Sequence, residues 1–171
     1  MNVSIEGNVG SGKTSLIRCL KDSSIKTVID PQNNVQYLTL NDFPWCVQKM
    51  IHFARPKTEE MILWENNPYI LLKVFGHLFT KPLLQSMQYS LFKAIVHRVI
   101  WKPTVMFYLD VDVDTIIQRN GFDSCRREIL LKVEKQYDYI LRHIQAVHVV
   151  HLDGTLPAET NAQIILKYLK I

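Results

Sequence analysis

The chain has 171 residues, 47% of them hydrophobic, which suits one domain with a buried core over residues 1–171 and excludes two. Lys and Arg exceed Asp and Glu by four, a mild basic excess that suits small anionic ligands and falls short of the stripe that nucleic-acid binding requires. Three widely spaced cysteines without a CxxC pair exclude a disulfide framework and a zinc ribbon.

Short β-branched runs alternate along the chain with longer amphipathic stretches. The predicted strands are NVSIEG at 2–7, IKTVID at 25–30, EMILWE at 60–65, TVMFYLDV at 104–111 and HVVHL at 148–152. Helical patterns begin at Gly12 and near Asn41, Pro68, Pro82 and Asp112, then cover 124–143, and a last one follows Pro157. This order predicts an α/β fold, a five-stranded parallel sheet flanked by helices on both faces. Ligands gather at the carboxyl ends of such strands, where Gly7, Asp30, Glu65 and Asp110 fall.

The stretch GNVGSGKT follows the first predicted strand and opens the first helix. Gly7, four residues and then Gly12-Lys13-Thr14 match the spacing of a phosphate-binding P-loop, and a glycine-rich turn formed by accident explains that spacing poorly. Glycines let backbone N–H groups point at phosphates, and the helix N-terminus adds partial positive charge. Lys13 would reach the β- and γ-phosphates, and the Thr14 hydroxyl would ligate Mg²⁺. The predicted ATP-binding residues are Gly7, Asn8, Val9, Gly10, Ser11, Gly12, Lys13 and Thr14.

Two carboxylates at predicted strand ends each have a catalytic and a structural interpretation. Asp30, just before Pro31, could accept the proton of an attacking hydroxyl, although Asp-Pro is also a turn signal. Glu65 suits a Mg²⁺ ligand, acting directly or through water, but could equally cap or begin the helix at Pro68. Taken one at a time, these residues leave both interpretations open.

Arginines flank a break between two helical patterns at QRNGFDSCRRE, residues 118–128. Arg119, Arg126 and Arg127 on a mobile lid could close over a transferring phosphoryl group and neutralise its developing charge. The alternative is a solvated loop with ordinary surface arginines.

These features together resemble the deoxynucleoside kinases. That family includes the deoxycytidine and deoxyguanosine kinases, the insect multisubstrate enzyme and the herpesvirus thymidine kinases. The resemblance covers Val3 to about Leu169 and is carried by IEGNVGSGKTSL, the acid-Pro after strand two, the acid and Asn-Pro after strand three, FYLDVDVDTIIQR and the arginine-bearing break. It implies a P-loop kinase fold and transfer of the ATP γ-phosphoryl group to the 5′-OH of a deoxynucleoside, with Asp30 and Lys13 among the catalytic residues.

The resemblance also implies a set of substrate-binding residues. Tyr37 and Gln48, eleven residues apart as in the family, would hold the deoxyribose 3′-OH and the base. Phe75, ten residues after Glu65, would stack on the base, and Glu128 would reach the sugar. Arg55, seven residues after Gln48, could bond a purine, while Glu65 would face the substrate as well as the metal. A pyrimidine is favoured, thymidine or deoxycytidine, with deoxyguanosine as a further candidate.

Three departures from the family pattern lie near the expected reaction centre. Asp30 stands where the family usually has Glu, and Asn66 stands where it has Arg. The segment between Asp30 and Tyr37 is also shorter than in the family, and it lacks the tryptophan that usually lies beside the sugar. These departures keep two alternatives open: a thymidylate-type nucleoside monophosphate kinase, or a nucleotide-binding interaction protein that has lost transfer activity.

Family members are commonly homodimers, and the apolar stretch 83–100 is the predicted interface. No signal-peptide pattern opens the chain, and no apolar run reaches about 18 residues, so we expect a soluble, cytoplasmic protein with no membrane partner. The compact chain and the Asn-Pro are compatible with a viral member of the family, which would act in the host cytoplasm.

Overall fold

The computed structural model describes residues 1–21, 23–28, 61–71, 73–74, 90, 94 and 101–171, and the statements below concern these. Five parallel strands form one sheet in the order β2-β3-β1-β4-β5. Their bounds are Asn2–Gly7 (β1), Lys26–Val28 (β2), Ile62–Glu65 (β3), Val105–Asp110 (β4) and His148–Asp153 (β5). The α/β fold with a five-stranded parallel sheet is therefore confirmed.

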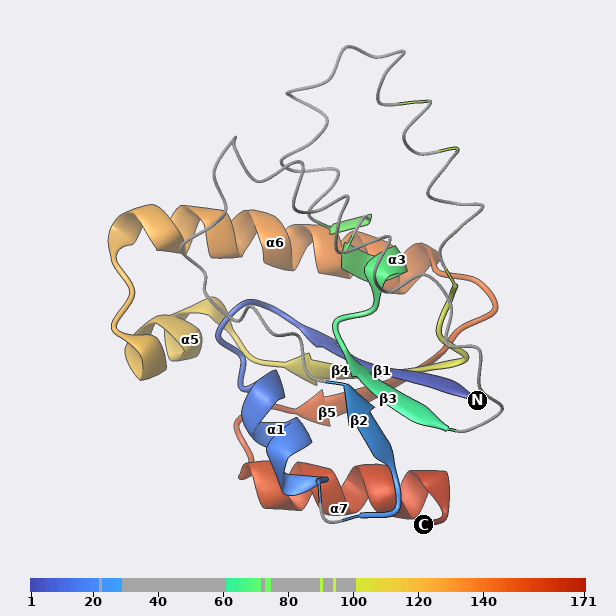
Figure 1. The fold of residues 1–171 in the computed structure, drawn as a ribbon. Coiled ribbons are helices and arrows are strands. Elements are labelled where there is room, and N and C mark those ends of the chain that lie inside the picture. Colours follow the sequence, from blue (N-terminus) through green and yellow to red (C-terminus); the bar gives the residue numbers. More distant parts are fainter. Residues whose placement is uncertain (22, 29–60, 72, 75–89, 91–93, 95–100) are drawn as a thin grey trace.

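Helices cover both faces of this sheet. On one face lie α6 (Ser124–His143) and the short α3 (Pro68–Leu71), and on the other lie α1 (Lys13–Cys19) and α7 (Ala158–Leu169), as Figure 1 shows. The remaining described helix, α5 (Val113–Asn120), connects the end of β4 to α6. No helix in the described part of the chain is long and apolar enough to cross a membrane.

The two faces of the sheet bury separate clusters of side chains. Alternate residues of the central strands, such as Val3 and Ile5 of β1, pack against α1 and α7 in the larger cluster. Met106 and Tyr108 of β4 point to the other face and pack with Val133, Tyr137 and Ile140 of α6. Both faces of each central strand are buried because a parallel sheet is sandwiched between helices. A polar side chain on either face is therefore removed from water.

Capping residues set the bounds of α5 and α6, which flank the break predicted as a lid at 118–128 and are called the lid helices below. Asp112 accepts a hydrogen bond from the Thr115 N–H at 2.8 Å, which starts α5. Asp123 accepts from the Arg126 N–H at 2.9 Å and starts α6. Between them, Gly121 ends α5 with φ 64, a left-handed conformation that glycine adopts without strain. The break predicted at 118–128 is therefore a short turn between two helices. Gly121 caps the end of α5 and Asp123 caps the start of α6.

Candidate active site

The P-loop lies between β1 and α1 at the carboxyl edge of the sheet. Its lysine is buried, and its ammonium donates to two carbonyls of the same loop, Gly7 O at 3.1 Å and Asn8 O at 2.8 Å. Because a bound phosphate offers stronger, charged acceptors, the Lys13 ammonium can exchange these carbonyls for phosphate oxygens without leaving the loop. The predicted phosphate-binding residues thus form one continuous structural unit.

The loop is so close to its neighbours that two of its positions require glycine. Gly7 has φ 152, and a Cβ there would lie 2.7 Å from the Leu109 carbonyl oxygen of β4. Gly10 has φ 79, and a Cβ there would lie 2.9 Å from Asn120 Nδ2 and 3.2 Å from the Phe122 ring. The loop therefore has its shape fixed by β4 on one side and by the start of the lid on the other.

Two asparagines, Asn8 of the loop itself and Asn120 of α5, bond the loop to elements that are far away in sequence. Asn8 donates from Nδ2 to the Leu130 carbonyl of α6 at 3.0 Å, and its Oδ1 accepts from the Val9 N–H at 2.8 Å. Asn120, the last residue of α5, donates from Nδ2 to the Gly10 carbonyl at 3.1 Å and to the Ile116 carbonyl at 2.8 Å. Both lid helices are therefore bonded to the loop.

Thr14 and Glu65 meet across the sheet edge. The Thr14 hydroxyl, in the first turn of α1, donates to Glu65 Oε1 at 2.5 Å, and the Glu65 side chain is buried at the end of β3. A hydroxyl and a carboxylate are oxygen ligands of the kind that Mg²⁺ prefers, so this pair fits the metal predicted for it. The interpretation of Glu65 as a helix cap is not supported, since its carboxylate contacts α1.

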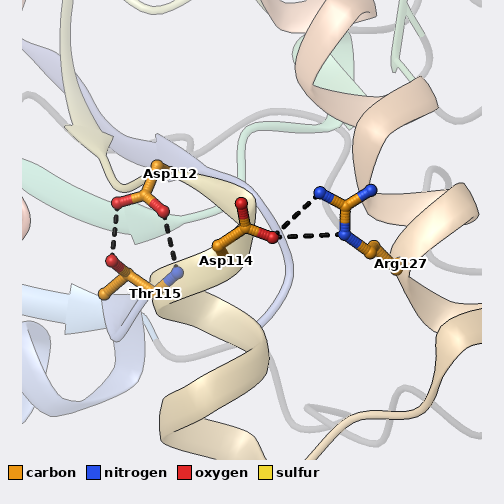
Figure 2. A network of polar contacts seen from close by, with 4 residues as sticks. All are labelled: Asp112, Asp114, Thr115 and Arg127. Atoms are coloured by element: carbon orange, nitrogen blue, oxygen red, sulfur yellow. Dashed lines mark hydrogen bonds and ion pairs between the residues drawn. The ribbon is translucent and has the colours of Figure 1, made fainter.

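The three lid arginines are each held by a protein group. Arg119 donates from Nη1 to the Gly154 carbonyl at 2.8 Å, and the Arg126 guanidinium lies 4.8 Å from the centre of the Phe122 ring. Figure 2 shows Arg127 of α6 pointing at Asp114 of α5, with Nε and Nη2 at 3.1 and 3.0 Å from Asp114 Oδ1. Each arginine would have to exchange its present partner for a phosphate oxygen.

Glu128 lies on the exposed side of α6. It accepts a hydrogen bond from Lys132 at 2.7 Å, and this ammonium lowers the pKa of the Glu128 carboxyl. Its predicted contact with the sugar stays a prediction. Asp30, Tyr37, Gln48, Arg55 and Phe75, together with most of the interface predicted at 83–100, lie outside the described residues.

Sequence reasoning missed a buried polar cluster beneath the loop. Glu6 of β1, Asn67 after β3 and Tyr137 of α6 are each 0% exposed. Glu6 Oε1 accepts from the Asn67 N–H at 2.5 Å, and the Tyr137 hydroxyl lies 3.5 Å from Glu6 Oε2. The available signal was a glutamate inside VSIEG, because a charged residue in a strand covered on both faces must be buried.

Burial dominates the electrostatics of that cluster. It raises the pKa of the Glu6 carboxyl from 4.5 to about 8, although the Asn67 N–H and the Lys13 charge act in the opposite direction. Burial likewise raises the pKa of the Tyr137 phenol well above its ordinary value, with the Glu6 carboxyl as a second cause. Both groups therefore keep their protons to a higher pH than an exposed glutamate or tyrosine does.

Comparisons with known proteins give the family and the fold of the chain. The family model for deoxynucleoside kinases matches residues 3–167. A solved structure of deoxyadenosine kinase from M. mycoides, with the products dCMP and a flexible dCDP bound, has a TM-score of 0.76 at 15% identity over 99% of each chain. Structures of that enzyme with bound dATP and with bound dCTP both have a TM-score of 0.72, at 16% identity over 100% of each chain and 17% over 99% of each chain. No curated protein matches the chain by sequence.

The family model covers nearly the whole chain. The chain belongs to the deoxynucleoside kinase family, phosphotransferases that use a nucleoside triphosphate as donor and an alcohol as acceptor.

Proposed function

We propose that this kinase transfers the γ-phosphoryl group of ATP to the 5′-OH of a deoxynucleoside, with a pyrimidine as the preferred base. The main support for the ATP-binding part of this proposal is the 2.5 Å contact between the Thr14 hydroxyl and Glu65 Oε1. This contact lies beside the P-loop, in which Lys13 is buried. Phosphoryl transfer depends on positioned cations more than on covalent chemistry, and this edge of the sheet supplies them.

On the donor side, the loop backbone from Gly7 to Gly12 and the Lys13 ammonium hold the ATP phosphates. Thr14 and Glu65 would hold Mg²⁺, which supplies charge neutralisation to the β- and γ-phosphate oxygens when it is bound. Asn8 and Asn120 keep the loop in the conformation that accepts the phosphates, since each bonds it to a lid helix.

On the acceptor side, Asp30 is the proposed general base for the 5′-OH. Tyr37 would bind the 3′-OH, Gln48 the base edge and Phe75 its face, while Arg55, Glu65 and Glu128 complete the nucleoside site. A Gln side chain offers one donor and one acceptor, which suits the edge of a pyrimidine and of some purines alike. Because the structurally similar M. mycoides enzyme is named a deoxyadenosine kinase and binds both dATP and dCTP, deoxyadenosine joins deoxyguanosine as a purine to be tested.

The lid would complete the site by closing over the phosphates. Arg119, Arg126 or Arg127 would then exchange a protein partner for the γ-phosphoryl oxygens, which stabilises the charge of the transition state and excludes water. The αα-turn that carries them is bonded to the P-loop through Asn120, so closure is coupled to occupation of the loop.

The deciding experiment is transfer of radiolabelled γ-phosphate from ATP with Mg²⁺ to dT, dC, dG and dA, with dTMP as a further acceptor. We expect a pyrimidine deoxynucleoside to be phosphorylated fastest and dTMP not at all. Asp30→Asn should lower turnover by about 10² or more while ATP binding persists.

Phosphorylation of dTMP in preference to every nucleoside would contradict the proposed acceptor, and an unchanged rate in Asp30→Asn would remove Asp30 from the mechanism. We also propose a homodimer through 83–100. A monomer by light scattering at micromolar concentration would contradict that interface.

A further inference from the structure

We infer that Glu6 is a positioning residue for the Mg²⁺ site: from the opposite face of the sheet it anchors the turn 65–67 and so keeps the Glu65 carboxylate against Thr14. The inference rests on the proposed role of Thr14 and Glu65, and it concerns a residue that touches neither ATP nor the metal in that proposal.

The two glutamates lie on opposite faces of the sheet. Glu65 is paired in register with Ile5, one residue before Glu6, and its carboxylate contacts Thr14 on the α1 side. Glu6 is paired in register with Tyr108, which packs with Tyr137 of α6 on the other side. Glu6 is therefore placed to act on the metal site without direct contact, through the chain that leaves β3.

Two consecutive amides after Glu65 are bound by two consecutive residues of β1. The Asn66 N–H donates to the Ile5 carbonyl at 3.1 Å, which continues the strand pairing by one residue. The Asn67 N–H then donates to Glu6 Oε1 at 2.5 Å, the first contact of the turn that depends on a side chain. Between these bonds the chain turns through Asn66, whose φ is 59. Without the second bond, the turn and the carboxylate before it lose an anchor.

A carboxyl group is costly to bury at this position. It is 0% exposed, and an apolar side chain of the same length would be buried there at lower cost. Its second oxygen is only loosely bonded, with the Tyr137 hydroxyl at 3.5 Å. The short bond to the Asn67 N–H is thus the strongest contact that the carboxyl makes. The carboxyl therefore acts by placing an acceptor oxygen where the Asn67 N–H can reach it.

The experiment separates the reach of the side chain from its charge. Glu6→Gln keeps an acceptor oxygen at the same distance from Cα, whereas Glu6→Asp keeps the carboxyl but withdraws it by one methylene. The readout is the Mg²⁺ concentration required for tight ATP binding by the full chain, measured by titration calorimetry without an acceptor. Glu159→Gln and Glu159→Asp, at the start of α7 on the other face, are the matched controls. Thermal unfolding establishes that every variant is folded.

We expect Glu6→Gln to require the same Mg²⁺ concentration as the wild type and Glu6→Asp to require about tenfold more, the effect seen when an outer partner of a metal ligand is lost. If Glu6→Asp does not fold, Glu6→Met replaces it, since it lacks the acceptor and is apolar. Wild-type Mg²⁺ dependence in the Asp and Met variants, or a raised requirement in Glu6→Gln, would overturn the inference.

This readout is independent of nucleoside phosphorylation. A wild-type chain that binds ATP with Mg²⁺ but phosphorylates no deoxynucleoside would contradict the proposed function and leave the role of Glu6 standing. ATP binding by the wild type that does not depend on Mg²⁺ would overturn the role of Glu6.

Discussion

Glu6 links the stability of the protein to pH. The folded carboxyl has a pKa of about 8 against 4.5 for an ordinary glutamate, so between these values the folded chain retains a proton that the unfolded chain has released. The free energy of unfolding therefore falls as pH rises through this window, by at most about 1.4 kcal/mol per pH unit. Lys13 and Tyr137 face the carboxyl, and the Tyr137 phenol titrates well above the window.

Glu6→Gln should remove this contribution, because an amide does not titrate. Urea unfolding of both proteins at intervals from about pH 5 to about pH 8 measures it as the difference between two slopes. A variant with the same slope as the wild type would show that other groups carry the pH dependence.

The backbone conformation of Asn66 predicts how substitutions at this position change stability. Its φ of 59 is left-handed, a conformation that Asn tolerates and that longer side chains adopt at a cost of about 1 kcal/mol or more. Asn66→Arg should therefore lower the free energy of unfolding by about that amount. It should also raise the transfer rate, because it places a cation near the proposed 5′-oxygen.

Asn66→Gln is the control for that variant, since it carries the same backbone cost without a charge. Denaturant unfolding and the phosphotransfer assay together separate the two effects. Equal rates in the Arg and Gln variants would show that no cation is needed at this position.

At the scale of elements, the ion pair between Asp114 and Arg127 joins the two lid helices, α5 and α6 (Figure 2). Their side chains are 76% and 48% exposed, so the pair contributes at most about 1 kcal/mol to stability. Asp114→Asn should leave the thermal midpoint nearly unchanged and release Arg127 for the phosphates. We expect a several-fold lower KM for ATP, and a loss of that gain in the double variant with Arg127→Ala.

Asp112→Asn is the matched control for the lid prediction, because asparagine still caps α5 and Asp112 contacts Thr115 instead of Arg127. The same gain in both variants would indicate a general effect of removing negative charge near the phosphates. No change in Asp114→Asn would mean that Arg127 is not the arginine that reaches them.

The same elements show what the sequence could predict. The helix predicted at 124–143 is observed at those bounds, since Asp123 caps it and an apolar face follows. The strand ends carrying Gly7, Glu65 and Asp110 were also predicted correctly, because strand patterns and the loop spacing are local signals. The Glu6 bond to Asn67 joins residues 61 positions apart, and the bond from Asn8 to Leu130 joins residues 122 apart. Such contacts depend on how the elements pack, which no local pattern specifies.

At the scale of the whole molecule, the site is built from segments that are far apart in the sequence. Bound Mg²⁺ and ATP would contact several of these segments at once. The P-loop, the turn after β3 and the lid converge on one edge of the sheet, and Lys13 already contacts two carbonyls there. A ligand that binds only the folded chain adds RT ln(1 + [L]/Kd) to its stability, about 4 kcal/mol at a thousand times Kd. We expect ATP with Mg²⁺ to raise the thermal midpoint by that mechanism.

Variants of Lys13 and Glu65 should separate the stabilisation that comes from the ATP phosphates from the stabilisation that comes from Mg²⁺. Lys13→Met removes the contact to the phosphates and should abolish the ATP-induced shift of the thermal midpoint, with or without Mg²⁺. Glu65→Gln leaves the loop and its lysine in place, so it should abolish only the additional shift that Mg²⁺ provides. A full shift in Lys13→Met would place the triphosphate outside the P-loop. A full Mg²⁺ contribution in Glu65→Gln would assign the metal to other oxygen ligands and would separate the metal site from the turn that Glu6 anchors.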